Sequence, residues 1–163
     1  MYSVREYLPG MRTFKTALSV FLCIAIWRIW NADIPFFACI AAVITTQNSI
    51  ESTKRVGLNR FLGTLIGACV GALIVWFLPN NTLTLTIGIV LVIHLTTLVK
   101  KGGSAAIACI VYLTIMINIG AESINTYILL RVIETTLGIM VATIINTSIR
   151  PPNEEDILDG TDK

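Results

Sequence analysis

The chain has 163 residues, of which 55% are apolar and only 13% charged, and its mean hydropathy is +0.78. A soluble domain carries about 25% charged residues, and a domain of this size could not bury so much apolar surface. The composition therefore excludes an intrinsically disordered chain, a secreted disulfide scaffold and a soluble enzyme, and it indicates that lipid surrounds most of the chain.

The net charge of +2 is unevenly distributed along the sequence. Residues 1–150 hold eleven Lys and Arg against five Asp and Glu, whereas five acids crowd the last ten residues. We therefore divide the chain into a membrane domain, 1–150, and a short acidic cytoplasmic tail, 151–163. The positive charge of the membrane domain favours anionic head groups or anionic solutes over cationic ones.

Six apolar runs predict the secondary structure. In chain order they cover residues 13–30, 35–50, 61–78, 83–99, 104–121 and 127–149. Helix-breaking stretches separate them, such as Leu-Pro-Asn-Asn-Thr at 78–82 and Lys-Lys-Gly-Gly at 100–103. Most runs have the length of a short spanning helix, and a single apolar segment in lipid satisfies its backbone polar groups only as a helix. The predicted fold is an all-α membrane protein with six transmembrane helices.

The basic residues predict the orientation of these helices. With the N terminus in the cytoplasm, only Arg28 and Arg131 of the twelve Lys and Arg fall on the outer side. An even number of spans then returns the C terminus to the cytoplasm as well.

The second and third runs resemble the fifth and sixth when the sequence is shifted by 71 residues. The shift places Glu51 on Glu122, Arg60 on Arg131, Thr64 on Thr135 and Gly67 on Gly138. Because each unit holds three spans, the second copy would be inverted, as in many transporters whose substrate site lies where the halves meet. The alternative interpretation is a helix-packing signature that both units share on an apolar background.

Small residues support close helix packing. Gly63, Gly67 and Gly71 recur every four positions in the third run, and Gly138 lies in the sixth. We expect these two helices to pack tightly, against each other or across a subunit boundary. A surface that slides during alternating access is the functional alternative.

Charged residues at membrane depth are candidates for function, because a charge at the bilayer centre costs about 3 kcal/mol. Arg131 and Glu134 are three residues apart in the sixth run, so they either neutralise each other or bind a carboxylate and carry a proton, respectively. His94, the only histidine, is either a buried hydrogen-bonding group or a proton relay.

Basic residues also gather near the predicted cytoplasmic face. Arg12 and Lys15 are one helical turn apart at the start of the first run, and Arg60 opens the third. Together they are expected to form an electropositive mouth for anions, although the positive-inside rule also predicts basic residues there. Asn146 adds an uncharged donor near the end of the sixth run.

Three segments resemble motifs of the bacterial aromatic acid exporter family. They are Gly-Met-Arg-Thr-Phe-Lys-Thr-Ala at 10–17, Gly-Leu-Asn-Arg-Phe-Leu-Gly-Thr-Leu-Ile-Gly at 57–67, and Arg-Val-Ile-Glu-Thr-Thr-Leu-Gly at 131–138 with Asn146 following. This family is grouped with the fusaric-acid-resistance-like proteins and is distantly similar to plant aluminium-activated malate transporters. The resemblance implies an oligomeric, six-helix anion exporter or channel of the bacterial plasma membrane. Many such proteins continue into a cytoplasmic helical domain, so regulation and assembly through that domain are not expected from these 163 residues.

The sequence thus predicts a homo-oligomeric exporter of organic, above all aromatic, carboxylates. The residues predicted to bind the anion are Arg12, Lys15, Arg60, Arg131 and Asn146, and those predicted to carry a proton are Glu134 and His94. A passive anion channel and a non-transporting membrane scaffold or partner subunit are the alternatives. Because the sequence has no HExxH, P-loop or GxSxG motif, the prediction includes no enzyme activity, cofactor, metal ion or nucleic acid.

Overall fold

The computed structural model describes residues 11–29, 33–99, 102–118 and 124–149. The described residues form helices and connections without a strand, which confirms the predicted all-α class. The helices are α1 (Met11–Arg28), α2 (Phe36–Thr45), α3 (Ile50–Phe77), α4 (Thr82–Leu98), the short 3₁₀ helix η2 (Gly102–Ser104), α5 (Ala105–Ile117) and α6 (Ile124–Ser148).

The third helix begins eleven residues earlier than hydropathy predicts. The hydroxyl of Ser49 accepts the backbone N–H of Ser52 at 3.1 Å and so caps the first turn of α3. Glu51, which falls between the second and third predicted runs, lies in that turn, and its charge suits the positive end of the helix. Polar residues such as Lys54 lower the local hydropathy of this turn without preventing the helix.

The helix lengths support only part of the prediction of six membrane spans. Among the described helices, only α3 and α6 are long and apolar enough to cross a membrane by themselves. With 10 and 13 residues, α2 and α5 rise only about 15 and 20 Å, less than the hydrocarbon core of about 30 Å. Helix α1 has 18 residues but carries Arg12, Lys15 and Arg28.

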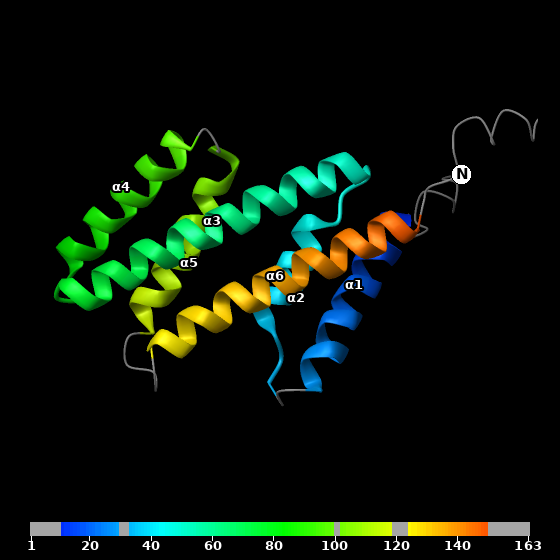
Figure 1. The fold of residues 1–163 in the computed structure, drawn as a ribbon, viewed down its shortest axis with the longest axis horizontal. Coiled ribbons are helices and arrows are strands. Elements are labelled where there is room, and N and C mark those ends of the chain that lie inside the picture. Colours follow the sequence, from blue (N-terminus) through cyan, green and yellow to red (C-terminus); the bar gives the residue numbers. More distant parts are fainter. Residues whose placement is uncertain (1–10, 30–32, 100–101, 119–123, 150–163) are drawn as a thin grey trace, which may run out of the picture.

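The two long helices form the centre of the molecule and run side by side in opposite directions (Figure 1). Gly57 of α3 lies against Ile139 of α6, and further along the pair Trp76 of α3 donates to Asn125 of α6. Each long helix also packs on a short one from the other half of the chain, α3 on α5 and α6 on α2. The remaining helices, α4 and α1, lie at the two ends, α4 against α3 and α5, and α1 against α2 and α6.

The glycines serve these contacts between long and short helices. A Cβ atom on Gly67 would lie 2.3 Å from the carbonyl oxygen of Ala108 in α5, and one on Gly138 would lie 2.2 Å from that of Ala38 in α2. Gly63 and Gly71 also face α5 or the residue before it. The two long helices do pack against each other, as expected, but Gly67 and Gly138 make their close contacts with α5 and α2 instead.

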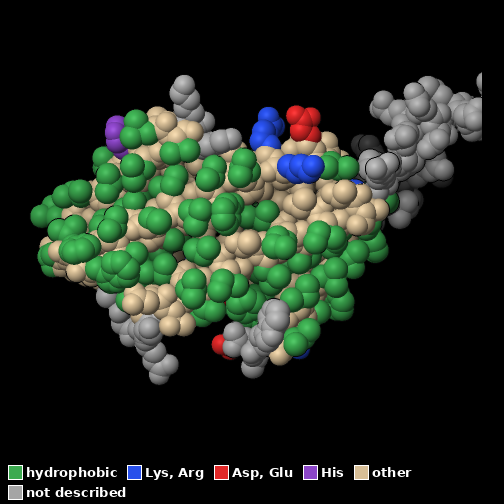
Figure 2. All heavy atoms as spheres, in the orientation of Figure 1, with side chains coloured by type: hydrophobic (Ala, Val, Ile, Leu, Met, Phe, Trp, Pro, Cys, Tyr) green, Lys and Arg blue, Asp and Glu red, His purple; other side chains and the backbone are tan. Residues whose placement is uncertain are grey.

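Apolar side chains cover the outside as well as the inside. Each of the six α-helices exposes large apolar side chains, among them Phe21, Phe77 and Ile117. In Figure 2, hydrophobic side chains occupy most of the visible face, and charged groups gather at a few places on it. Soluble monomers rarely expose so much contiguous apolar surface, so the exterior suits lipid.

Candidate functional site

The charged residues predicted to form the site separate into distinct groups in the structure. Three basic side chains are largely buried, with exposed fractions of 3% for Lys15, 5% for Arg60 and 15% for Arg131. Among the described residues, Glu134, which is 6% exposed, is the one buried acid that could balance them. The described interior therefore carries an excess of positive charge.

The first group joins α1 to α6 through a buried hydrogen-bond network. The ammonium of Lys15 donates to Asn146 Oδ1 at 3.0 Å, and Asn146 Nδ2 donates to Thr53 Oγ1 at 2.6 Å. The hydroxyl of Thr53 also accepts the backbone N–H of Gln47 at 3.1 Å. Arg12 lies nearby but is exposed, and its Nε donates to the carbonyl oxygen of Thr46 at 3.3 Å. The side chains of Lys15 and Asn146 thus both form hydrogen bonds that hold helices together.

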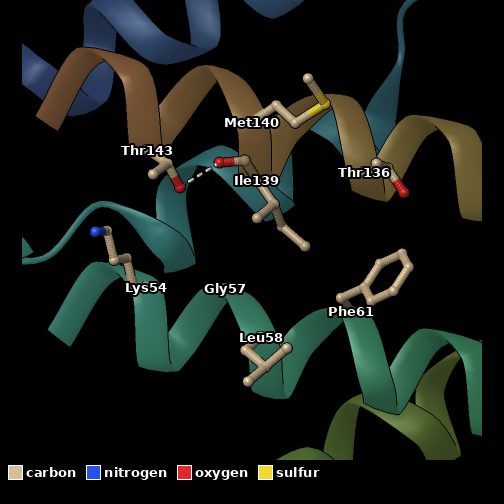
Figure 3. A pocket seen from close by; sticks show the side chains of 8 residues that line it. All are labelled: Lys54, Gly57, Leu58, Phe61, Thr136, Ile139, Met140 and Thr143. Carbon is tan, nitrogen blue, oxygen red and sulfur yellow. Dashed lines mark hydrogen bonds between the residues drawn. The ribbon is translucent and has the colours of Figure 1, made fainter. Parts of the chain in front are cut away.

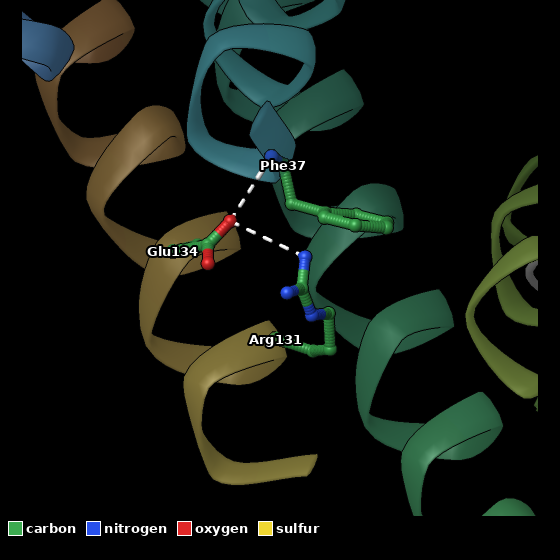
Figure 4. Close-up of polar contacts among 3 residues, drawn as sticks. All are labelled: Phe37, Arg131 and Glu134. Atoms are coloured by element: carbon green, nitrogen blue, oxygen red, sulfur yellow. Dashed lines mark hydrogen bonds and ion pairs between the residues drawn. The ribbon is translucent and has the colours of Figure 1, made fainter. Parts of the chain in front are cut away.

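The second group surrounds the start of α2 (Figure 4). Glu134 Oε2 accepts the backbone N–H of Phe37 at 3.0 Å and lies 3.5 Å from Nη1 of Arg131. The Arg131 guanidinium also lies over two aromatic rings, 4.1 Å from the centroid of Phe37 and 4.5 Å from that of Tyr127. The predicted pairing of Arg131 with Glu134 is therefore present, and two aromatic side chains enclose the arginine.

The third group is a cavity of about 260 Å³ where α2, α3, α5 and α6 meet. Its polar lining comes from Arg60 and Thr64 of α3 and Thr135 of α6. Apolar side chains from α2 and α5 complete the walls: Phe37, Ile40, Ile44, Ala106, Ile107, Ile110 and Val111. Such a lining, mostly apolar with a few polar groups, is typical of small-molecule sites.

Arg60 has an unusual environment within this cavity. Its guanidinium forms no hydrogen bond or ion pair with the described part of the chain, and its Nε is completely buried without a partner. The hydroxyl of Thr64 donates to the carbonyl oxygen of Arg60 at 3.0 Å, so its lone pairs, and not its proton, remain for other contacts. A buried arginine without a counter-ion is costly, and an anion in the cavity would compensate its charge.

A second hollow, about 350 Å³, lies between α3 and α6 and is more open (Figure 3). Thr136 and Thr143 line it, but their hydroxyls already donate to the carbonyl oxygens of Val132 and Ile139. Lys54 is its one basic group. The hollow thus offers an anion fewer buried polar contacts than the cavity at Arg60 does.

The structure does not gather the predicted site residues in one place. Arg12, Lys15 and Asn146 lie together at the α1–α6 contact, whereas Arg60 lines the cavity and Arg131 pairs with Glu134. His94 is exposed on α4, away from these groups.

Sequence reasoning did not identify Phe37, Thr64 and Thr135 as site residues. The two threonines carry a signal, because the 71-residue shift aligns them and each follows an aligned arginine by four residues. Phe37 has no such signal, since it reads as one apolar residue of its run.

The sequence model of the family described as "Aromatic acid exporter family member 1" matches residues 8–149. A UPF0421 protein of Bacillus cereus is 29% identical over 161 residues, which cover 98% of this chain and 45% of that protein. A UPF0421 protein of Oceanobacillus iheyensis is 28% identical over 146 residues, 88% of this chain and 41% of that protein.

These relatives are longer than the chain described here. The chain spans about half the length of the curated relatives that it matches, and the names of these relatives give no substrate. No solved structure matches the fold. The family match extends over most of the chain and includes all three motifs that resemble the exporters, so the chain belongs to the aromatic acid exporter family.

Proposed function

We propose that this chain is the membrane part of an exporter of aromatic carboxylates and that the cavity at Arg60 binds the substrate. The observation that carries the proposal is a buried guanidinium without a counter-ion on the wall of an apolar cavity. A carboxylate would neutralise Arg60 through its planar donor fork, and an apolar ring would fill the rest of the space.

The size of the cavity favours a small substrate. Its volume of about 260 Å³ is below the range of about 300–1,000 Å³ that is common for drug-sized ligands. A single-ring acid suits this space better than a large conjugate. The lining also favours an anion, because the described wall contains Arg60 but neither Asp nor Glu.

The arrangement of the helices supports a transporter built from two inverted halves. If α1, α2 and α3 are exchanged with α4, α5 and α6, the pairs in contact are exchanged as well: α3–α5 becomes α6–α2, and α1–α6 becomes α4–α3. The cavity lies between the halves, lined by α2 and α3 of one and α5 and α6 of the other. Substrate sites of inverted-repeat transporters are found in this position.

The proposal includes further features of the whole protein. We include in it six helices that span a bacterial plasma membrane, both termini in the cytoplasm, coupling of transport to protons, and a homo-oligomeric assembly. The apolar surfaces of all six α-helices support membrane embedding. Lys54 and Arg55, which are exposed in the first turns of α3, support a cytoplasmic position for that end of the helix.

The test is benzoate binding and transport by the purified chain. Binding is measured in detergent, and efflux of labelled benzoate is measured from proteoliposomes at pH 8, where the acid is ionised, with protein-free liposomes as the background. We expect the wild type and Arg55→Gln, an exposed control on the same helix, to bind and transport benzoate. Arg60→Gln should lose at least 10-fold in affinity, since a hydrogen-bonded buried charge pair contributes about 2 kcal/mol or more. Unchanged binding and efflux by Arg60→Gln would refute the site, and absence of both in the wild type would refute the function.

A further inference from the structure

Phe37 is a residue of the cavity wall that its neighbours hold in an unusually well-defined position. It lies in the first turn of α2, where backbone N–H groups have no partner within the helix. The preceding Pro35 provides no side-chain cap, and Glu134 of α6 instead accepts the N–H of Phe37 at 3.0 Å. A carboxylate from another helix thus caps α2 at the residue that lines the cavity.

The side chain of Phe37 is held as well as its backbone. The Arg131 guanidinium lies 4.1 Å from its ring centroid, and the ion pair with Glu134 holds the guanidinium in turn (Figure 4). Tyr127 lies on the same guanidinium at 4.5 Å, and the ring of Phe36 meets that of Phe37 edge-on at 5.4 Å. Contacts from two helices therefore limit the rotation of the Phe37 ring.

Arg131 and Glu134 reach the cavity through Phe37 and not directly. Neither is among the side chains that line the cavity, whereas Phe37 lines it together with Arg60. Nη1 of Arg131 lies near the Glu134 carboxylate and two rings enclose the guanidinium, although its Nε, like that of Arg60, is buried without a partner. Arg131 therefore offers a substrate less than Arg60 does.

We propose that Phe37 is the specificity-determining residue that selects aromatic over saturated ring acids, and that Arg131 and Glu134 are positioning residues which act through it. This inference rests on the proposed function of the Arg60 cavity. An ordered aromatic wall offers a substrate ring the offset or edge-to-face packing that aromatic pairs prefer. The cation beside Phe37 also compensates the negative face of its ring, which reduces repulsion toward an anionic ligand.

The experiment compares two acids of nearly equal size and charge, benzoate and cyclohexanecarboxylate. The measured quantity is the ratio of their dissociation constants for the purified chain in detergent at pH 8. Aromatic packing beyond buried area corresponds to a preference of roughly 2- to 12-fold for benzoate in the wild type. Phe37→Leu should bring the ratio close to one while cyclohexanecarboxylate still binds, and Phe37→Met repeats the test with a more adaptable side chain.

A control is available on α1, away from Phe37. Phe21 is exposed and does not line the cavity, so Phe21→Leu should keep the wild-type ratio. For the positioning residues, Arg131→Met should lower the ratio, and Arg131→Lys, which keeps a cation near the rings, should restore part of it. A purely structural role for Arg131 would change both dissociation constants equally and leave the ratio unaltered.

The outcomes separate this inference from the proposed function. A wild-type ratio retained by both Phe37→Leu and Phe37→Met would overturn the role of Phe37 while Arg60 remains the anion site. Loss of both acids in Arg131→Met, as expected for Arg60→Gln, would instead make Arg131 a direct ligand and overturn its positioning role. If the wild type binds neither acid, or Arg60→Gln binds both normally, the proposed function itself fails.

Discussion

Substitution of Arg60 by methionine is expected to make the protein more stable while it abolishes ligand binding. Arg60 is 5% exposed, and its guanidinium has no hydrogen bond or ion pair within the described part of the chain. An arginine at the centre of a membrane helix costs about 2.5–3.5 kcal/mol on insertion scales, and methionine replaces its apolar stem without that cost. Exchange even of buried ion pairs for apolar side chains has stabilised other proteins by about 1–4 kcal/mol.

The stability change is measurable as a melting temperature. For a chain of this length, each kcal/mol shifts the thermal midpoint by about 2–4 °C, so Arg60→Met should raise it by roughly 2–16 °C without ligand. The assay is thermal unfolding of purified protein in detergent micelles, combined with a benzoate titration of the same samples. Benzoate should raise the midpoint of the wild type, because a ligand that binds only the folded state stabilises it, but not that of Arg60→Met.

Arg131→Met provides the contrast, since it removes a guanidinium that does have a partner. Loss of the 3.5 Å contact would leave Glu134 buried without its counter-ion, which costs about 3 kcal/mol. We therefore expect a lower midpoint for Arg131→Met and a higher one for Arg60→Met. A midpoint for Arg60→Met that falls as far as that of Arg131→Met would refute the reasoning, because Arg60 would then contribute to the fold and not to a ligand site.

Two further predictions concern the contacts that hold the helices together. Gly67→Ala and Gly138→Ala each place a Cβ within 2.3 Å of a backbone carbonyl oxygen. In the same thermal assay, the unfolding free energy of each variant should be about 1–3 kcal/mol lower than that of the wild type. Gly71→Ala is their control, because its Cβ would meet only the side chain of Ile115, at 3.1 Å, and equal midpoints for all three variants would contradict the packing described. Asn146→Leu removes the acceptor of the buried Lys15 ammonium and the donor to Thr53, and it should cost about 3 kcal/mol. The double variant Lys15→Met with Asn146→Leu should recover part of this loss, whereas additive losses would show that the ammonium has another partner.

The sequence predicts the number and order of the helices well because their boundaries depend on local chemistry. Asn81, whose side chain accepts the N–H of Thr84, caps α4, and this helix begins one residue before the predicted start. Pro79 follows the end of α3. Hydropathy fails at the start of α3, where charged residues occupy a helix that begins with the cap at Ser49. A run of apolar residues marks what lipid tolerates, and capping residues mark where the backbone becomes helical.

The candidate site is less predictable, because it depends on distances between helices. The sequence aligns Arg60 with Arg131 and offers Glu134 as a partner for Arg131, but it does not show that Arg60 lines a cavity and that Arg131 does not. Phe37 and Glu134 are 97 residues apart in the chain, and only the packing of α2 on α6 brings them together. The cavity likewise requires four helices, and most of its lining consists of apolar side chains of α2 and α5 that resemble ordinary core residues.

The different roles of the two arginines follow from one aligned position. The 71-residue shift that places Arg60 on Arg131 also places Gly63 on Glu134. A carboxylate at position 63 could pair with Arg60 as Glu134 pairs with Arg131, but even a Cβ there would lie 2.7 Å from the carbonyl oxygen of Ser104. The close packing at the start of α5 therefore excludes the counter-ion that Arg60 would otherwise have. The same glycine that allows the helices to approach each other leaves a buried positive charge for a ligand to neutralise.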